Sequence, residues 1–164
     1  MSKKKKIIII IVLAFIALVL FGINSVKAAN ARKRAENSQV DIELLQDFPL
    51  DADMKQACQW LEEKGLEYEL KGGMVEEVAT PNGWLLSICT NNAGPRGLYF
   101  ALHVFDKNNY EIIYKRTQQQ QTESFGEPSY NSGGVMEWML AENRRLYVNY
   151  HLDTGQVNVE IEPF

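Results

Sequence analysis

The chain contains two histidines and two cysteines, the residue types that most often act as bases and nucleophiles. Cys89 with His103 is the one conceivable nucleophile–base pair, and a disulfide at Cys89 would forbid it. His103 and His151 both fall inside expected strands, away from glycine-bounded turns, and no serine occupies a nucleophile elbow. The sequence therefore predicts a protein that is not an enzyme.

Acidic side chains do not form a site pattern either. The glutamate pairs at 62–63 and 76–77 are adjacent in sequence, which is typical of a solvated surface rather than of general acid–base catalysis. Asp51 and Asp53 lack the rest of a calcium loop, and neither cysteine has a further ligand at zinc spacing. No glycine-rich phosphate loop is present. We therefore expect no metal and no cofactor.

The two cysteines, Cys58 and Cys89, lie in the part of the chain that we expect to be exported. An even number of cysteines outside the cytoplasm favours a disulfide. Closing a loop of this length would stabilise the fold by about 3–4 kcal/mol in the chain-entropy model. The alternative is a pair of buried free thiols.

Apolar periodicity after residue 50 predicts a helix followed by strands. Asp51 or Asp53 caps a helix that ends near Lys64, where Gly65 supplies the stop. Apolar and polar residues then alternate between glycine-rich or proline-rich turns. The expected strands are 66–71, 74–80, 84–90, 98–105, 136–140, 146–152 and 157–161, with loops at 91–97 and 129–134 and a turn at 142–143.

The stretch from residue 110 to 121 fits two patterns. Tyr110, Ile113 and Tyr114 have helical spacing, whereas Tyr110, Ile112 and Tyr114 have strand spacing. The four glutamines at 118–121 favour the helix. Both halves of the chain then share one order: helix, glycine stop and antiparallel meander. The fold class is α+β, an antiparallel sheet with one or two helices on one face, preceded by a single N-terminal hydrophobic helix.

Binding residues are expected on the strand faces that point away from the core. On 98–105 these are Tyr99, His103 and Phe105, and on the later strand they are Tyr147, Asn149 and His151. If the two strands lie near one another, one face displays aromatic and imidazole groups, which are enriched at interface anchors. The alternative is that helices cover this face. The acidic stretch 62–77 is a second candidate patch, or simply a solvated edge.

The N-terminal segment has the order of an export signal. Four lysines precede the uncharged run 7–23, and small residues follow to Ala31. The run is short for a spanning helix and long for a signal core, so 1–31 is either a membrane anchor or a cleaved signal peptide. We expect a linker at 32–49 and an α+β binding domain at 50–164.

Charge separates the N-terminal segment from the rest of the chain. Residues 1–34 hold eight basic and no acidic side chains, whereas residues 35–164 hold nine basic and 21 acidic ones, a net charge of −12. Phosphate backbones repel such a domain, so no nucleic acid is expected as a partner. An acidic surface favours a basic protein partner, or it serves solubility alone.

Several C-terminal residues carry a family resemblance: the run Phe125 to Pro128, then Trp138, then 146–148 and 155–157. This pattern resembles the small outer-membrane assembly lipoproteins of the BamE type, in which a helix ends in a similar turn and leads into a three-stranded antiparallel sheet. It is also similar to periplasmic immunity proteins and inhibitors with tandem helix-plus-sheet units. This chain lacks the lipid-carrying cysteine, so the likeness implies a fold and no site residue.

These observations lead to one expected function and one alternative. We expect a non-enzymatic protein-binding domain in the bacterial envelope, free in the periplasm or on the periplasmic face of the inner membrane. Among binding proteins, we expect an immunity-type inhibitor of a basic partner such as a secreted toxin. The alternative is a structural helper in envelope assembly.

Overall fold

The computed structural model describes residues 3–90, 97–140 and 143–163, and for residues 3–11 it describes only the helical backbone. The expected loop at 91–97 and turn at 142–143 therefore fall almost entirely outside the described residues. Two compact units divide the chain, Met1–Asn37 and Ser38–Phe164.

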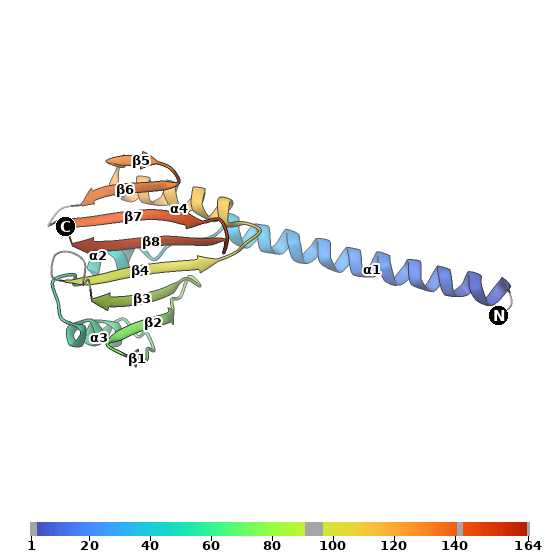
Figure 1. The fold of residues 1–164 in the computed structure, drawn as a ribbon, viewed down its shortest axis with the longest axis horizontal. Helices are drawn as coiled ribbons and strands as arrows, with labels where there is room; N and C mark the ends of the chain where they lie inside the picture. The colour runs from blue at the N-terminus through green and yellow to red at the C-terminus, as the bar shows by residue number, and fades with distance from the viewer. Residues whose placement is uncertain (1–2, 91–96, 141–142, 164) are drawn as a thin grey trace. The chain divides into compact units, whose positions relative to one another are not determined.

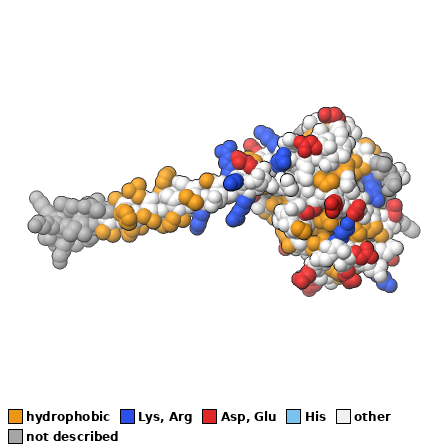
Figure 2. All heavy atoms as spheres, turned by 180° about the vertical axis from the view of Figure 1, so that it is seen from behind, with side chains coloured by type: hydrophobic (Ala, Val, Ile, Leu, Met, Phe, Trp, Pro, Cys, Tyr) orange, Lys and Arg blue, Asp and Glu red, His pale blue; other side chains and the backbone are white. Residues whose placement is uncertain are grey.

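The first unit is one continuous helix, α1 (Lys3–Glu36). It is about 51 Å long at 1.5 Å per residue, which exceeds the ~30 Å of a bilayer core. Figure 2 shows apolar side chains along this helix and then a group of lysines and arginines. Val12–Glu36 is long and apolar enough to cross a membrane, a property that signal sequences share. The helix therefore suits an anchor or a signal peptide.

The second unit is an eight-stranded antiparallel sheet with helices (Figure 1). The strand order is β1-β2-β3-β4-β8-β7-β6-β5, and every neighbouring pair is antiparallel. The strands are β1 (Leu70–Lys71), β2 (Met74–Ala79), β3 (Leu85–Thr90), β4 (Leu98–Phe105), β5 (Tyr130–Ser132), β6 (Val135–Leu140), β7 (Arg144–His151) and β8 (Gln156–Pro163). The expected α+β class is confirmed.

The two halves of this unit repeat the same order of elements. Helix α3 (Met54–Glu63) precedes the meander β1–β4, and helix α4 (Tyr110–Phe125) precedes the meander β5–β8. The last strands of the two meanders, β4 and β8, pair with each other at the centre of the sheet. The halves are therefore arranged like two copies that face each other across the β4–β8 seam.

Local signals explain where α3 begins and ends, and the second expected helix is present as well. Asp53 caps α3 through a capping box, since its side chain accepts from the Gln56 N–H and the Gln56 side chain accepts from the Asp53 N–H. Gly65, with φ of 70°, follows the helix as expected. The stretch from Tyr110 is helical, so the helix prediction there is confirmed.

The core lies on one face of the sheet, which we call the inner face. Its side chains are apolar and almost fully buried: Val78, Leu86, Ile88, Leu98, Phe100, Leu102, Met136, Trp138, Leu146, Val148, Val157, Val159 and Ile161. Both helices pack here, because Trp60 of α3 meets Phe100 edge-on and Tyr114 of α4 meets Tyr150 of β7. Figure 1 shows the helices behind the sheet on this side.

The segment expected as a linker, 32–49, is instead divided between two structures. Its first residues continue α1 to Glu36, and residues Ile42–Asp47 form a short helix, α2. Val40, Leu45 and Phe48 are at most 2% exposed, so this stretch belongs to the core. The reason is the helical spacing of its apolar residues, which lets them cover the inner face beside α3 and α4.

Three strand predictions need correction. The expected strand 66–71 is reduced to Leu70–Lys71, and the expected polar loop at 129–134 contains β5. The alternation along 157–161 predicts that Asn158 faces water together with Glu160 and Glu162, but Asn158 is only 5% exposed. Its strand, β8, lies in the middle of the sheet rather than at an edge, so neighbours on both sides cover it.

Candidate binding surface

The six expected binding residues lie on one face of the sheet, opposite the core, which we call the outer face. Along β4 the inward residues Leu98, Phe100 and Leu102 are fully buried, and the residues between them point the other way. The same alternation on β7 places Leu146 and Val148 inward. Tyr99, His103, Phe105, Tyr147, Asn149 and His151 therefore share the outer face.

The strand β8 separates the two groups and aligns them in rows. His103 is opposite Asn158, which is opposite Asn149, and Phe105 is opposite Gln156, which is opposite His151. Tyr147 is aligned through Glu160 with Ala101. With neighbouring strands about 4.8 Å apart, β4 and β7 are about 10 Å from each other. The structure thus brings the two expected groups onto one continuous patch, without direct contact between them.

The outer face is open to solvent in the described part of the chain. Phe105 is 51% exposed and His151 is exposed, while the other four expected residues are half-buried by their neighbours on the sheet. The helices lie behind the sheet in Figure 1, against the inner face. The alternative that helices cover this face is therefore wrong.

A chain of polar side chains runs across the middle of the outer face. The Asn158 amide donates to Oδ1 of Asn149 at 2.9 Å, and the Asn149 amide donates to Oε1 of Glu160 at 3.1 Å. Burial, and then the nearby carboxylate of Glu160, raise the pKa of Tyr99 far above its usual range. Tyr99 therefore stays a neutral hydroxyl beside a carboxylate.

A second group surrounds Tyr147. Arg145 donates to Oε1 of Glu162 at 2.7 Å, and its guanidinium carbon lies 4.9 Å from the centre of the Tyr147 ring. Burial raises the pKa of Tyr147 to about 12, with Glu162 and Glu137 adding to the effect of burial and Arg145 opposing it. Arg145 is thus held between a carboxylate and an aromatic ring, an arrangement that fixes its planar group.

His103 has a partly buried imidazole next to Phe105, with ring centres 5.4 Å apart and planes nearly perpendicular. Burial lowers its pKa, although the carboxylates of Glu77 and Glu160 act in the opposite direction. At neutral pH the ring is uncharged, so it offers one donor and one acceptor to a ligand.

Sequence reasoning missed several residues of this surface, namely Arg145, Asn158, Glu160 and Glu162. The alternation along 157–161 placed the β8 residues correctly opposite the core. What it did not provide was the strand order, because the pairing of β4 with β8 joins segments more than fifty residues apart. Without that pairing, these polar side chains resemble an ordinary solvated edge.

The conceivable Cys89–His103 pair does not form. Cys89 is opposite Tyr99, whereas His103 is opposite Leu85, so the two are four residues apart along the paired strands, about 13 Å. Burial raises the pKa of the Cys89 thiol, which keeps it protonated and weakly nucleophilic. No group of three metal-binding side chains occurs among the described residues.

The expected disulfide is wrong as well, since Cys58 and Cys89 are both free. Cys58 belongs to α3, which packs on the inner face. Cys89 lies between Ile88, which points inward, and Thr90, so its side chain is on the outer face. The sheet itself separates the two sulfur atoms.

The acidic stretch 62–77 is exposed along one end of the sheet. Part of its charge is neutralised within the domain, because Lys71 pairs with Glu69 at 2.9 Å. The Tyr68 hydroxyl donates to Glu62 at 3.0 Å, which satisfies that carboxylate without removing its charge. Surface pairs of this kind contribute little to stability. This patch shows the features of a solvated edge.

Comparisons with protein-family models, with curated proteins and with solved structures give no match to this chain.

Proposed function

We propose that this chain is a non-enzymatic binding protein of the bacterial envelope whose outer face binds a basic protein partner. The observation that carries the proposal is the alignment of aromatic, imidazole, amide and carboxylate groups across β4, β8 and β7. Tyrosine and arginine are common interface anchors, since they combine a large contact area with hydrogen bonding.

Charge supports a basic partner. The outer face carries Glu137, Glu160 and Glu162 on neighbouring strands, and its cation Arg145 is already paired with Glu162. The domain as a whole is strongly acidic. Complementary charge speeds encounter and disfavours acidic competitors. A partner that presents lysine or arginine side chains therefore meets both a favourable field and three partly exposed carboxylates.

Export defines the class of binding protein. The apolar helix α1 suits delivery across the cytoplasmic membrane, with the acidic domain on the far side. An acidic, exported domain that covers a basic partner is what an immunity-type inhibitor of a secreted toxin requires. We propose this role first. The intact mass of the purified protein tests whether α1 is retained as an anchor.

A structural role in envelope assembly is the second candidate, and one contact favours it. Helix α4 ends at Phe125, Gly126 has a φ of 82°, and the Trp138 indole donates to the Gly126 carbonyl at 2.8 Å. The residues that carry the resemblance to assembly lipoproteins are thus joined in space. Deletion separates the candidates: loss of a helper makes cells leaky to detergents, whereas loss of an immunity protein harms only cells exposed to the toxin.

Site-specific photocrosslinking in living cells tests the binding surface. A photoreactive phenylalanine derivative replaces Tyr99 or Tyr147 in the full chain, and the control places it at Gln119, an exposed position on α4. We expect an adduct with a basic protein from positions 99 and 147 and none from 119. Equal adducts from all three positions, or an acidic partner, would refute the proposal.

A further inference from the structure

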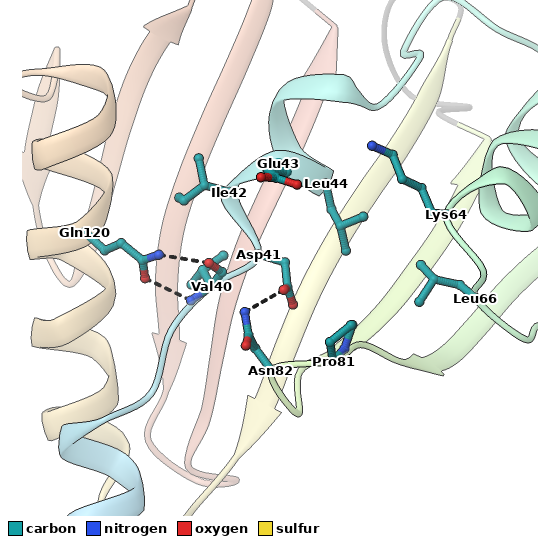
Figure 3. A pocket seen from close by; sticks show the side chains of 10 residues that line it. All are labelled: Val40, Asp41, Ile42, Glu43, Leu44, Lys64, Leu66, Pro81, Asn82 and Gln120. Carbon is teal, nitrogen blue, oxygen red and sulfur yellow. Dashed lines mark hydrogen bonds between the residues drawn. The ribbon is translucent and has the colours of Figure 1, made fainter.

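A hollow lies on the helix-bearing side of the sheet domain, away from the outer face. It has a volume of about 440 Å³, within the usual size of small-ligand sites. Figure 3 shows that its walls come from the chain before and within α2, from the segment after α3, from the turn after β2 and from α4. The lining residues are Val40, Asp41, Ile42, Glu43, Leu44, Lys64, Leu66, Pro81, Asn82 and Gln120.

Hydrogen bonds across the hollow hold its walls in place. The Gln120 side chain accepts from the Val40 N–H and donates to the Val40 carbonyl, both at 2.8 Å. The Asn82 amide donates to Oδ1 of Asp41 at 2.6 Å. Figure 3 shows both interactions bordering the same space. The hollow is therefore preformed, which lowers the entropy cost of filling it.

Its negative charge is incompletely compensated. The other carboxylate oxygen of Asp41, Oδ2, is buried and has no hydrogen-bond partner in the described part of the chain. Lys64, the one cation among the described lining residues, is instead paired with Asp47 at 2.6 Å. Glu43 adds a second carboxylate on the same wall as Asp41. Asp41 as a whole is partly exposed, and a carboxylate with one unsatisfied oxygen favours a nearby donor or cation.

The remaining walls are apolar. Leu44 and Leu66 are buried, and Ile42 and Pro81 complete that side. A ligand that fits must combine a short aliphatic stem with a compact cationic end. Guanidinium suits this better than ammonium, because its planar donors can serve a carboxylate in a bidentate manner and it is more weakly hydrated.

We propose that this hollow binds an alkylguanidinium group, with the stem against Leu44 and Leu66 and the cation at Asp41 and Glu43. The same chemistry is presented by an arginine side chain of a protein and by a free alkylguanidine. The residues that line the hollow are not part of the outer face. The guanidinium site can therefore be correct or incorrect whether or not the proposed function is.

The test is titration of the full ¹⁵N-labelled chain in detergent micelles, followed by backbone amide shifts. The probe is n-butylguanidinium, and the control probe is n-butylurea, which has nearly the same shape and no charge. We expect saturable shifts at Val40, Asp41, Leu66 and Asn82 with the cation, with an affinity in roughly the millimolar range for so small a ligand. Equal binding of the urea, or no saturable shift with the cation, would overturn the proposal.

Two variants address the carboxylate. Asp41→Asn should weaken binding about tenfold, since it removes the charge and keeps the shape. Asp51→Asn is the matched control, because Asp51 is exposed and does not line the hollow. Amide dispersion checks that each variant is folded, and Glu43→Gln offers a second lining position. Unchanged affinity in both lining variants contradicts the assignment.

A blocked tripeptide with a central arginine distinguishes the two sources of the ligand. Tighter binding of the peptide than of butylguanidinium indicates an arginine on a protein partner, because the peptide flanks add contacts at the rim. Equal or weaker binding of the peptide indicates a free alkylguanidine. Failure of the crosslinking at positions 99 and 147 would leave this result unaffected.

Discussion

Replacing Phe48 with alanine should strongly destabilise the sheet domain. Phe48 is fully buried, with its ring centre 4.5 Å from that of Phe100 on β4 and 5.3 Å from that of Trp60 on α3. It therefore joins the segment before α3 to both the sheet and a helix. The Leu98 N–H donates to the Leu50 carbonyl at 3.0 Å, so the backbone beside Phe48 is attached to β4 as well.

The expected loss follows from the size of the cavity. Truncating a buried phenylalanine to alanine typically costs about 3–5 kcal/mol, and the aromatic contacts place Phe48 toward the upper part of that range. Domains of this size are stable by roughly 5–15 kcal/mol. The variant should thus lose roughly a quarter or more of its free energy of unfolding.

Urea denaturation of the full chain in detergent micelles measures this loss, with tryptophan fluorescence as the signal. Trp60 is a direct reporter, since it contacts the substituted position. Phe105→Ala is the matched control: the same atoms are removed from a ring that is 51% exposed, so its cost should be within about 0.5 kcal/mol. If Phe48→Ala were as stable as Phe105→Ala, the segment 40–50 would not contribute to the core, and the assignment of Phe48 to the core would be wrong.

Three further predictions concern titratable groups. N-ethylmaleimide should add to both Cys58 and Cys89 in denatured, unreduced protein, as mass spectrometry would show. A chain that reacts only after reduction would show that the two cysteines form a disulfide. Because the pKa of Tyr147 is about 12 in the folded domain and about 10 when unfolded, the unfolded chain loses this proton first. Stability should fall as the pH rises between these values, and Tyr147→Phe should flatten that part of the urea-midpoint profile. Burial lowers the pKa of His103, so the unfolded chain takes up this proton first as the pH falls below ~6.5. The free energy of unfolding should therefore decline on acidification. An unchanged pH dependence of stability in His103→Gln would refute this.

Local patterns explain most of what could be predicted from the sequence. Alternating side chains and glycine turns were enough to locate β2, β3, β4, β6, β7 and β8, a capping residue located α3, and the glutamine run favoured helix at α4. These signals act within a few residues. The six expected binding residues could be grouped for the same reason, since alternation alone decides which side of a strand a residue occupies.

Features that depend on distant contacts could not be predicted. Tyr130–Ser132 has only exposed side chains, so β5 shows no alternation and exists because β6 offers an edge. Val40, Leu44 and Phe48 have helical spacing, but a six-residue helix followed by a proline is too short to be recognised without the inner face that it covers. The free cysteines follow from the two faces of the sheet, and cysteine count carries no information about faces.

The centre of the outer face carries residues that weaken a sheet. Asparagine is poorly suited to strands, yet Asn149 and Asn158 are opposite each other on two central strands, and Oδ1 of Asn158 is buried without a partner among the described residues. Positions that break local rules at a cost in stability are typical of functional sites. Asn158→Val should therefore raise the urea midpoint, because valine fits a central strand, and should lower the yield of the crosslink at position 147. The Gln119→Ala variant, which changes an exposed position on α4 and leaves the outer face intact, provides the reference for crosslinking. A valine variant that is more stable and crosslinks normally would show that the asparagines serve neither binding nor stability. The asparagines would then no longer support the outer face as a binding surface.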